Sequence, residues 1–148
     1  MTTSDPNKII QSSRLVTATP QEIFDLLADP RQHSLIDGSG SVQQARVNAP
    51  ERLSLGAKFG MDMKIGLPYR ITNEVVDFDE PRCIGWRHFG GHVWRYVLEA
   101  VDGGTMVTEQ FDWTHSKSPR VLKAMGAFDK NRRSIEATLE RLAAHFAK

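Results

Sequence analysis

The sequence predicts an α+β fold, in which an antiparallel sheet of about six to seven strands packs against one long C-terminal helix. Residues 57–65 alternate apolar and polar side chains, which is typical of a strand with one buried face. Further β-rich segments continue to residue 113, and the breaks between them are short enough to join antiparallel neighbours. After Ser118-Pro119 the apolar residues recur at helical spacing. The sheet is therefore complete before the final helix begins.

The first elements are a strand and two short helices. Residues 8–18 are rich in β-branched and apolar side chains and end at Thr19-Pro20-Gln21-Glu22. This motif is typical of a helix start, because its threonine can cap the first turn, its proline suits the first helical position and its glutamate closes a capping box. Asp29-Pro30 ends this helix and starts a second short turn that runs to about Ile36. Residues 1–6 are expected to form a loose arm.

A glycine-rich loop and a run of strands follow. The loop, Asp37-Gly38-Ser39-Gly40, contains residues that tolerate left-handed backbone conformations. Strand-like sequence begins at Gln43, and the later candidates are 57–65, 69–78, 83–89, 93–101 and 105–113. The breaks between these candidates are Pro68, Asp79-Glu80-Pro81, Gly90-Gly91 and Asp102-Gly103-Gly104.

The last element is expected to be a single helix of about seven to eight turns. Its apolar stripe consists of Val121, Met125, Phe128, Ile135, Leu139, Leu142 and Phe146. Arg132 occupies the stripe position between Phe128 and Ile135. Because the residues near the start of the helix are smaller or softer than those near Leu142, we expect any void beneath it to lie toward its N-terminal half.

Composition narrows the class of protein. A chain of 148 residues has the usual size of one domain, so we expect a single domain over residues 1–148. The 19 Lys and Arg residues nearly balance the 18 Asp and Glu residues, which argues against nucleic-acid binding. No apolar run is long enough for a membrane span, and residues 1–8 lack the layout of a secretory signal, so a cytoplasmic protein is expected. Cys83 is the only cysteine, which excludes an internal disulfide and thiolate zinc sites.

Several motifs stand at characteristic places in this order of elements. They are Thr19-Pro20-Gln21-Glu22-Ile23-Phe24, Asp37-Gly38-Ser39-Gly40, Glu80-Pro81 before Trp86, and Trp94-Arg95-Tyr96 before Gly103-Gly104-Thr105. Together with the terminal helix, they resemble the helix-grip fold of the START-like or SRPBCC superfamily, and within it the bacterial polyketide cyclase/dehydrase-like proteins. The similarity covers nearly the whole chain.

The resemblance implies a curved sheet that wraps the long helix and leaves a cavity between them. Members of the superfamily bind lipids, sterols, hormones or polyketides there, and some catalyse cyclisation or dehydration. The fold does not choose among these roles. Three classes therefore stay open: a binder or carrier of a hydrophobic small molecule such as a lipid, polyketide or other aromatic compound; a cyclase or dehydratase; and a protein-interaction module. No cofactor is implied, and the oligomeric state is not predicted.

One predicted hairpin face gathers aromatic side chains around a single carboxylate. A turn at Asp102-Gly103 pairs Tyr96 with Glu109, whereas a turn at Gly103-Gly104 pairs Tyr96 with Phe111, and the face is the same in both cases. This face contains Trp94, Tyr96, Leu98, Val107, Glu109, Phe111 and Trp113. A carboxylate among aromatic rings is costly unless it is hydrogen-bonded, paired, protonated or hydrated.

Arg132 is equally out of place in the apolar stripe of the helix. We hypothesise that Glu109 and Arg132 approach each other across the cavity and anchor a carbonyl, hydroxyl or carboxylate of a ligand, with Tyr96 as a further donor. The alternative is that Arg132 extends off the edge of the stripe into water and that Glu109 reaches solvent at the sheet margin.

Histidines supply further candidates. If residues 89–91 form a three-residue loop, Trp86 pairs with Trp94 and His88 lies near the cavity rim. His88 is then either a structural hydrogen-bonding residue or an acid-base group. In an enzyme, Glu109, His88 or Tyr96 would act on an enolisable carbonyl. His33 and Asp37 flank the glycine-rich loop, but two ligands are too few for zinc, so no metal is expected.

The expected ligand-binding residues are those predicted to face the cavity. They are Met61, Met63, Trp86, Trp94, Tyr96, Glu109, Phe111, Trp113, Met125, Phe128 and Arg132. The flexible methionine thioethers would suit a pocket that adapts to more than one apolar guest.

Overall fold

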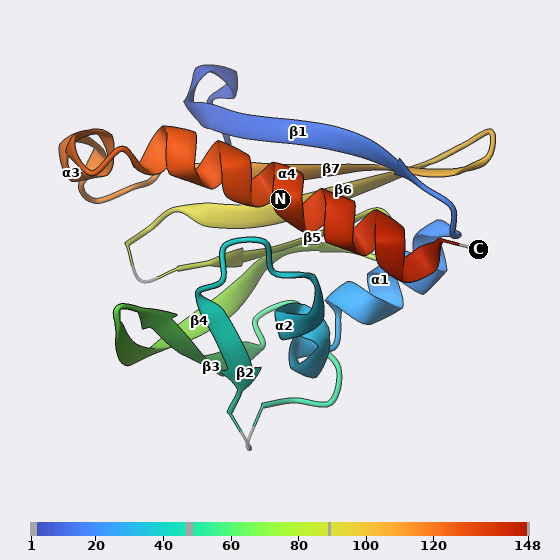
Figure 1. Ribbon diagram of the computed structural model, residues 1–148, viewed down its shortest axis with the longest axis horizontal. Helices are drawn as coiled ribbons and strands as arrows, with labels where there is room; N and C mark the ends of the chain where they lie inside the picture. Colours follow the sequence, from blue (N-terminus) through green and yellow to red (C-terminus); the bar gives the residue numbers. More distant parts are fainter. Residues whose placement is uncertain (1–2, 47–48, 89, 148) are drawn as a thin grey trace.

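A computed structural model describes residues 3–46, 49–88 and 90–147 and has the predicted α+β fold (Figure 1). Its strands are β1 (Ile9–Val16), β2 (Val42–Ala45), β3 (Lys58–Ile65), β4 (Leu67–Asp79), β5 (Cys83–Arg87), β6 (Val93–Val101) and β7 (Gly104–Asp112). Its helical elements are η1 (Pro6–Lys8), α1 (Pro20–Leu27), η2 (Pro30–Gln32), α2 (His33–Ile36), α3 (Pro119–Ala124) and α4 (Ala127–Phe146). Within the described residues the strands form one antiparallel sheet in the order β1-β7-β6-β5-β4-β3-β2, and α4 lies across it in a helix-grip arrangement.

The start of α1 follows from its sequence. The hydroxyl of Thr19 accepts a hydrogen bond from the backbone N–H of Glu22 at 3.1 Å, and the Glu22 carboxylate accepts one from the backbone N–H of Thr19 at 3.2 Å. This capping box satisfies N–H groups that the first helical turn leaves unpaired. The predicted helix start is therefore confirmed.

The strand registers decide between the turns that the sequence left open. Tyr96 lies opposite Glu109, and Trp94 lies opposite Phe111, which is the register of a turn at Asp102-Gly103. Trp86 lies opposite Trp94, which confirms the pairing expected from a three-residue loop. Phe89, within that loop, lies outside the described residues.

The sequence predicts one continuous final helix, but the structure divides it into α3 and α4. Gly126 separates the two with a φ of +67°, a left-handed conformation that residues with a Cβ resist. The prediction of a single helix is wrong, because the spacing of apolar residues stays helical even where one residue, here Gly126, leaves the helical backbone conformation. As a consequence, Met125 projects from the junction and is largely exposed.

Two smaller features also differ from expectation. The break after β3 falls at Gly66, which has a φ of +72°, and Pro68 lies within β4 opposite Lys64. The N-terminal arm is anchored where it is described: the backbone N–H of Asp5 donates to the Thr114 hydroxyl at 2.9 Å. Residues 3–6 are therefore not a loose arm.

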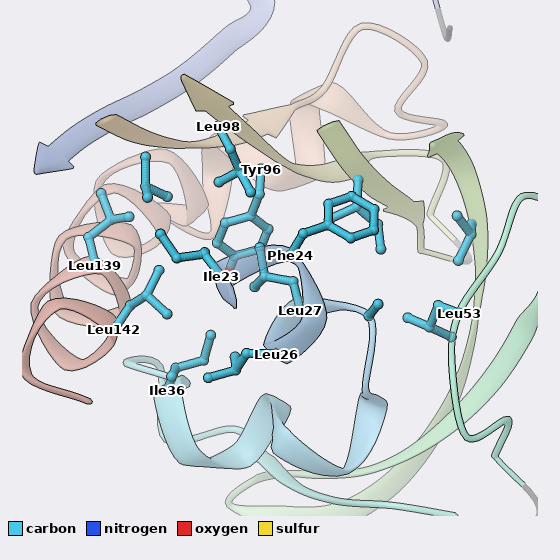
Figure 2. Close-up of a cluster of buried hydrophobic side chains, with 14 of the residues drawn as sticks. Ile23, Phe24, Leu26, Leu27, Ile36, Leu53, Tyr96, Leu98, Leu139 and Leu142 are labelled. Atoms are coloured by element: carbon cyan, nitrogen blue, oxygen red, sulfur yellow. The ribbon is translucent and has the colours of Figure 1, made fainter. Parts of the chain in front are cut away.

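The core fills the space between the sheet and the C-terminal half of α4. Figure 2 shows Leu139 and Leu142 of α4 facing Ile23 of α1, with Tyr96 and Leu98 of β6 behind them. α1 thus occupies one end of the space that the sheet encloses. Cys83 is also buried, and this burial raises the pKa of its thiol to about 11, so it stays a protonated core residue.

Within the described residues, no helix combines the length and the apolar character that a crossing of the bilayer requires.

Candidate functional site

A cavity of about 410 Å³ lies between the sheet and the N-terminal half of α4. Its lining includes Ala127, Asn131, Ser134 and Thr138 of α4 but neither Leu142 nor Phe146, which confirms the predicted position of the void. The physical reason is the placement of α1, which fills the other end of the same space (Figure 2).

Aromatic rings form much of the cavity wall. The indole of Trp86 stacks on the His33 ring with centroids 4.7 Å apart, and the ring of Trp94 packs on Phe111 at 4.9 Å. His33 is fixed from behind, because its Nε2–H donates to the Leu27 carbonyl at 2.8 Å. Burial lowers the pKa of His33, against the opposing effect of that hydrogen bond, so the ring is neutral at neutral pH. The wall is therefore rigid and uncharged here.

Glu109 is the acidic group in the middle of this wall. Its residue is 5% exposed, and within the described structure its Oε1 has no hydrogen-bond partner. Burial raises the pKa of the carboxyl to about 8, although the interaction with the Tyr96 hydroxyl opposes this shift, and the charge of Asp37 adds to it. The carboxyl is therefore mostly protonated at neutral pH and can donate a hydrogen bond into the cavity.

A second polar group faces the cavity from β4. Asn73 is buried and lines the cavity, and its Oδ1 has no hydrogen-bond partner among the described residues. An unpaired buried amide oxygen is costly unless water or a ligand donates to it. The sequence analysis missed Asn73, although a polar residue between the inward-facing Ile71 and Val75 was the available signal.

His88 and His92 flank the turn between β5 and β6. Their rings stack with centroids 4.7 Å apart, and both residues line the cavity. Burial lowers the pKa of each to about 4, and the neighbouring His88 contributes to the shift of His92. His88 and His92 are both partly buried, and the sequence analysis did not single out His92 as a site residue.

These histidines should make the fold sensitive to acid. In the unfolded chain they take up protons near pH 6.5, but in the folded chain only near pH 4. Their contribution to stability is therefore present above pH 6.5 and is lost as the pH falls toward 4. The variant His92→Phe keeps an aromatic ring but cannot take up this proton. We expect its melting temperature to fall less than that of wild type when the pH is lowered from about 7 to about 5. Equal losses in both proteins, measured by circular dichroism, would contradict this assignment.

The structure places most predicted ligand-binding residues on the cavity wall. Those that line it are Met61, Met63, Trp86, Trp94, Tyr96, Glu109, Phe111 and Met125. Trp113 and Phe128 instead pack on each other at 4.9 Å between ring centroids, outside the cavity. Whether the lining residues bind a ligand stays a prediction.

Arg132 does not meet Glu109, so the hypothesis of an anchoring pair is wrong. The Arg132 side chain is 56% exposed and lies 3.9 Å from Asp129 on the outer surface of α4. Each helical residue advances by about 100°, so Arg132 and Ser134 point to nearly opposite sides. Ser134 lines the cavity. Arg132 therefore lies on the flank of the apolar stripe that faces away from the cavity.

The cavity face of α4 is a row of small and polar residues. Ala127, Asn131, Ser134 and Thr138 follow at spacings of four, three and four beside the apolar stripe. Sequence reasoning missed this row, although its helical spacing was visible. The cavity thus has one aromatic wall and one polar wall.

Sequence comparisons place the chain among known proteins. Residues 8–147 match the family described as "Polyketide cyclase / dehydrase and lipid transport". The chain is 38% identical to an uncharacterized Mycobacterium tuberculosis protein, Rv0088, over 149 aligned residues that cover 97% of this chain. The chain spans 66% of the length of that relative.

Solved structures with low sequence identity share the fold. Protein Ms6760 from Mycobacterium smegmatis has a TM-score of 0.68 at 20% identity, covering 97% of this chain and 96% of the other. Protein CV1439 from Chromobacterium violaceum has a TM-score of 0.71 at 14% identity, covering 95% of this chain and 98% of the other. These matches support the helix-grip arrangement alone.

Proposed function

Because the chain belongs to the polyketide cyclase/dehydrase and lipid transport family, we propose that it binds a hydrophobic small molecule in the cavity between the sheet and α4. The observation that carries this proposal is the cavity itself. Its volume of about 410 Å³ falls in the usual range for small-molecule sites, and the sheet side of its wall is largely apolar and aromatic. An empty apolar space of this size is costly for a fold unless a guest or water fills it.

Two polar groups define what the guest should carry. The protonated carboxyl of Glu109 is a donor that suits a carbonyl oxygen, and Oδ1 of Asn73 is an acceptor that suits a hydroxyl or N–H group. Both groups belong to strands of the sheet, and the sheet side of the cavity is otherwise largely apolar and aromatic. The ligand we propose is therefore an apolar or aromatic molecule with a carbonyl and a hydroxyl or amine at separate positions, such as a polyketide or an oxidised lipid.

Filling the cavity should weaken binding strongly. We expect Ser134→Trp, which places an indole in the cavity, to weaken binding of the fluorescent probe 1-aminoanthracene by roughly tenfold or more, because the probe loses its apolar contacts. Arg132→Trp adds the same indole on the outer surface of α4 and should leave the affinity within about twofold. Fluorescence titration measures both. No probe binding by wild type, or equal losses in both variants, would contradict the proposal.

A proton-transfer enzyme is the second candidate, because Glu109 has a pKa of about 8 and lies opposite Tyr96 on the cavity wall. An acid-base group with a pKa near the working pH can both remove and return a proton. Its test is deuterium exchange at the α-carbon of 1-tetralone in D₂O, followed by NMR. An enzyme of this kind accelerates the exchange, and Glu109→Gln removes the acceleration.

A protein-interaction module is less well supported than either small-molecule role. Its expected signs were a filled core together with a large exposed apolar patch, and the first of these is not met, because the space beside α4 holds a cavity. The open cavity therefore favours a small guest.

A further inference from the structure

We propose that the mouth of the cavity docks on the surface of an anionic lipid bilayer. The docking surface, called the mouth rim below, consists of residues 63–70 at the turn between β3 and β4 and residues 117–126 of α3 and its junction with α4. This inference goes beyond the binding of a guest, since it concerns where a guest enters and leaves.

The mouth rim exposes large apolar side chains on two separate segments. Ile65 is 57% and Leu67 is 80% exposed on the first segment, and Val121 is 54% and Met125 is 73% exposed on the second. Solvent exposure of four such side chains at one end of a small protein is unfavourable, and it is typical of a surface that contacts a partner.

The two segments lie at the same end of the molecule and border the same cavity. Ile65 and Met125 both line the cavity while remaining exposed, so they lie where it opens. Figure 1 shows α3 and the turn between β3 and β4 toward the left of the view, away from α1. Apolar side chains inserted at this end would bring the cavity mouth into contact with lipid.

Charge identifies the partner as anionic. Residues 63–70 and 117–126 contain Lys64, Arg70, Lys117, Arg120 and Lys123 and no Asp or Glu, in a chain whose net charge is only +1. The adjacent carboxylates are paired: Asp62 lies 3.2 Å from Arg46 and 3.8 Å from Arg70 of the rim, and Asp129 lies 3.9 Å from Arg132. Lys64, Lys117, Arg120 and Lys123 belong to none of these pairs. Exposed apolar residues interleaved with basic ones are characteristic of a surface that inserts shallowly into anionic lipid, because burial and electrostatic attraction act together.

The pattern favours a bilayer over a protein partner. Lys and Arg can extend toward lipid phosphates while the apolar side chains insert below them. A contact between two copies of this rim would instead bring like charges together without an acidic counterpart.

Co-sedimentation with lipid vesicles tests the proposal. Wild type should bind phosphatidylcholine vesicles containing about 30% phosphatidylglycerol at least roughly tenfold more tightly than vesicles of phosphatidylcholine alone. Leu67→Glu/Val121→Glu should weaken binding to the anionic vesicles by roughly tenfold or more, because it removes two inserting side chains and adds two negative charges.

A charge-matched control separates docking from general electrostatics. Leu15→Glu/Leu55→Glu replaces two other exposed leucines. Leu15 lies beside the turn between β6 and β7, and Leu55 precedes β3, at the end of that strand opposite Ile65. This variant should keep vesicle binding within about threefold of wild type. Equal losses in both double variants, or no vesicle binding by wild type, would overturn the proposal.

The failure of docking and the failure of ligand binding are distinguishable. Neither Leu67 nor Val121 lines the cavity, so Leu67→Glu/Val121→Glu should bind 1-aminoanthracene like wild type in the absence of vesicles. Sedimentation velocity adds one more outcome. If wild type is a dimer that this variant converts to a monomer, the rim is an interface between two copies, and the bilayer proposal is wrong.

Discussion

Replacing Arg95 with methionine is expected to lower the free energy of unfolding by about 3–5 kcal/mol, measured by urea denaturation near pH 7. Arg95 is buried, and because its neighbours Trp94 and Tyr96 on β6 line the cavity, Arg95 lies on the opposite face of the sheet. Its Nε donates to Asp77 at 2.8 Å, and its two terminal nitrogens donate to Asp112 at 3.2 Å each. Removing the guanidinium leaves two buried carboxylates without their cation, and this uncompensated charge is the reason for the large expected loss.

The neighbours of Arg95 explain how the sheet accommodates it. Gly85 lies beside Arg95 in the register, and a Cβ on Gly85 would lie only 3.3 Å from the Cβ and Cγ atoms of Arg95. The missing side chain leaves room for the arginine to reach Asp77 on β4. Burial would raise the pKa of Asp112, but hydrogen bonds from Ser4 and Thr114 and the charge of Arg95 lower it overall.

Matched variants make the Arg95 prediction specific. Adding Asp77→Asn and Asp112→Asn to Arg95→Met should recover part of the lost stability, since both uncompensated charges are then removed. Arg82→Met removes an arginine that pairs with Asp79 at the surface, and it should change stability little. If Arg95→Met were no more harmful than Arg82→Met, the buried cluster would not stabilise the fold.

Glu109→Gln is expected to stabilise the ligand-free protein at alkaline pH. The ordinary pKa of this carboxyl is 4.5, and burial raises it to about 8 in the folded protein. Because the folded state holds the proton more tightly, this group favours folding below pH 4.5, and its contribution is lost as the pH rises toward 8. The contribution of this carboxyl to the free energy of unfolding is therefore smaller at pH 8 and above than below pH 4.5, by at most about 5 kcal/mol.

Thermal unfolding across this interval tests the prediction. The melting temperature of Glu109→Gln should exceed that of wild type, and the excess should grow from about pH 5 to about pH 8, because glutamine does not ionise. Glu99→Gln changes an exposed glutamate of β6 and should show no such trend. A constant difference across this range would mean that the Glu109 carboxyl is not held in its protonated form.

The same substitution distinguishes the two candidate functions. Glutamine keeps a hydrogen-bond donor at this position, so the variant should still bind 1-aminoanthracene. It cannot accept and return a proton, so any deuterium exchange that the wild type catalyses should disappear. Retained exchange in Glu109→Gln would exclude the carboxyl as the acid-base group.

Much of the fold was predictable because its signals are local. The capping box at Thr19 and Glu22 involves residues three positions apart, and the inward face of β6 follows from alternation along one strand. The same alternation placed Glu109 among aromatic side chains. Both signals act within a few residues, so no knowledge of distant packing was required.

The site was only partly predictable, because it depends on how distant elements pack. Helical spacing correctly brought Leu139 and Leu142 to the core, but it could not show which flank of α4 faces the cavity. That orientation depends on the contacts of α4 with β1 and β7. Arg132 was therefore expected in the cavity, whereas Asn131 and Ser134 line it.

The sequence by itself determined the order of elements, the inward face of the sheet and the presence of one carboxylate among aromatic rings. Tertiary structure alone decided that α1 fills one end of the enclosed space, that the buried Oδ1 of Asn73 has no hydrogen-bond partner among the described residues and that Arg95 joins Asp77 and Asp112. The reason is physical: secondary structure depends on interactions between residues a few positions apart, whereas cavities and buried charges depend on contacts between segments far apart in the chain.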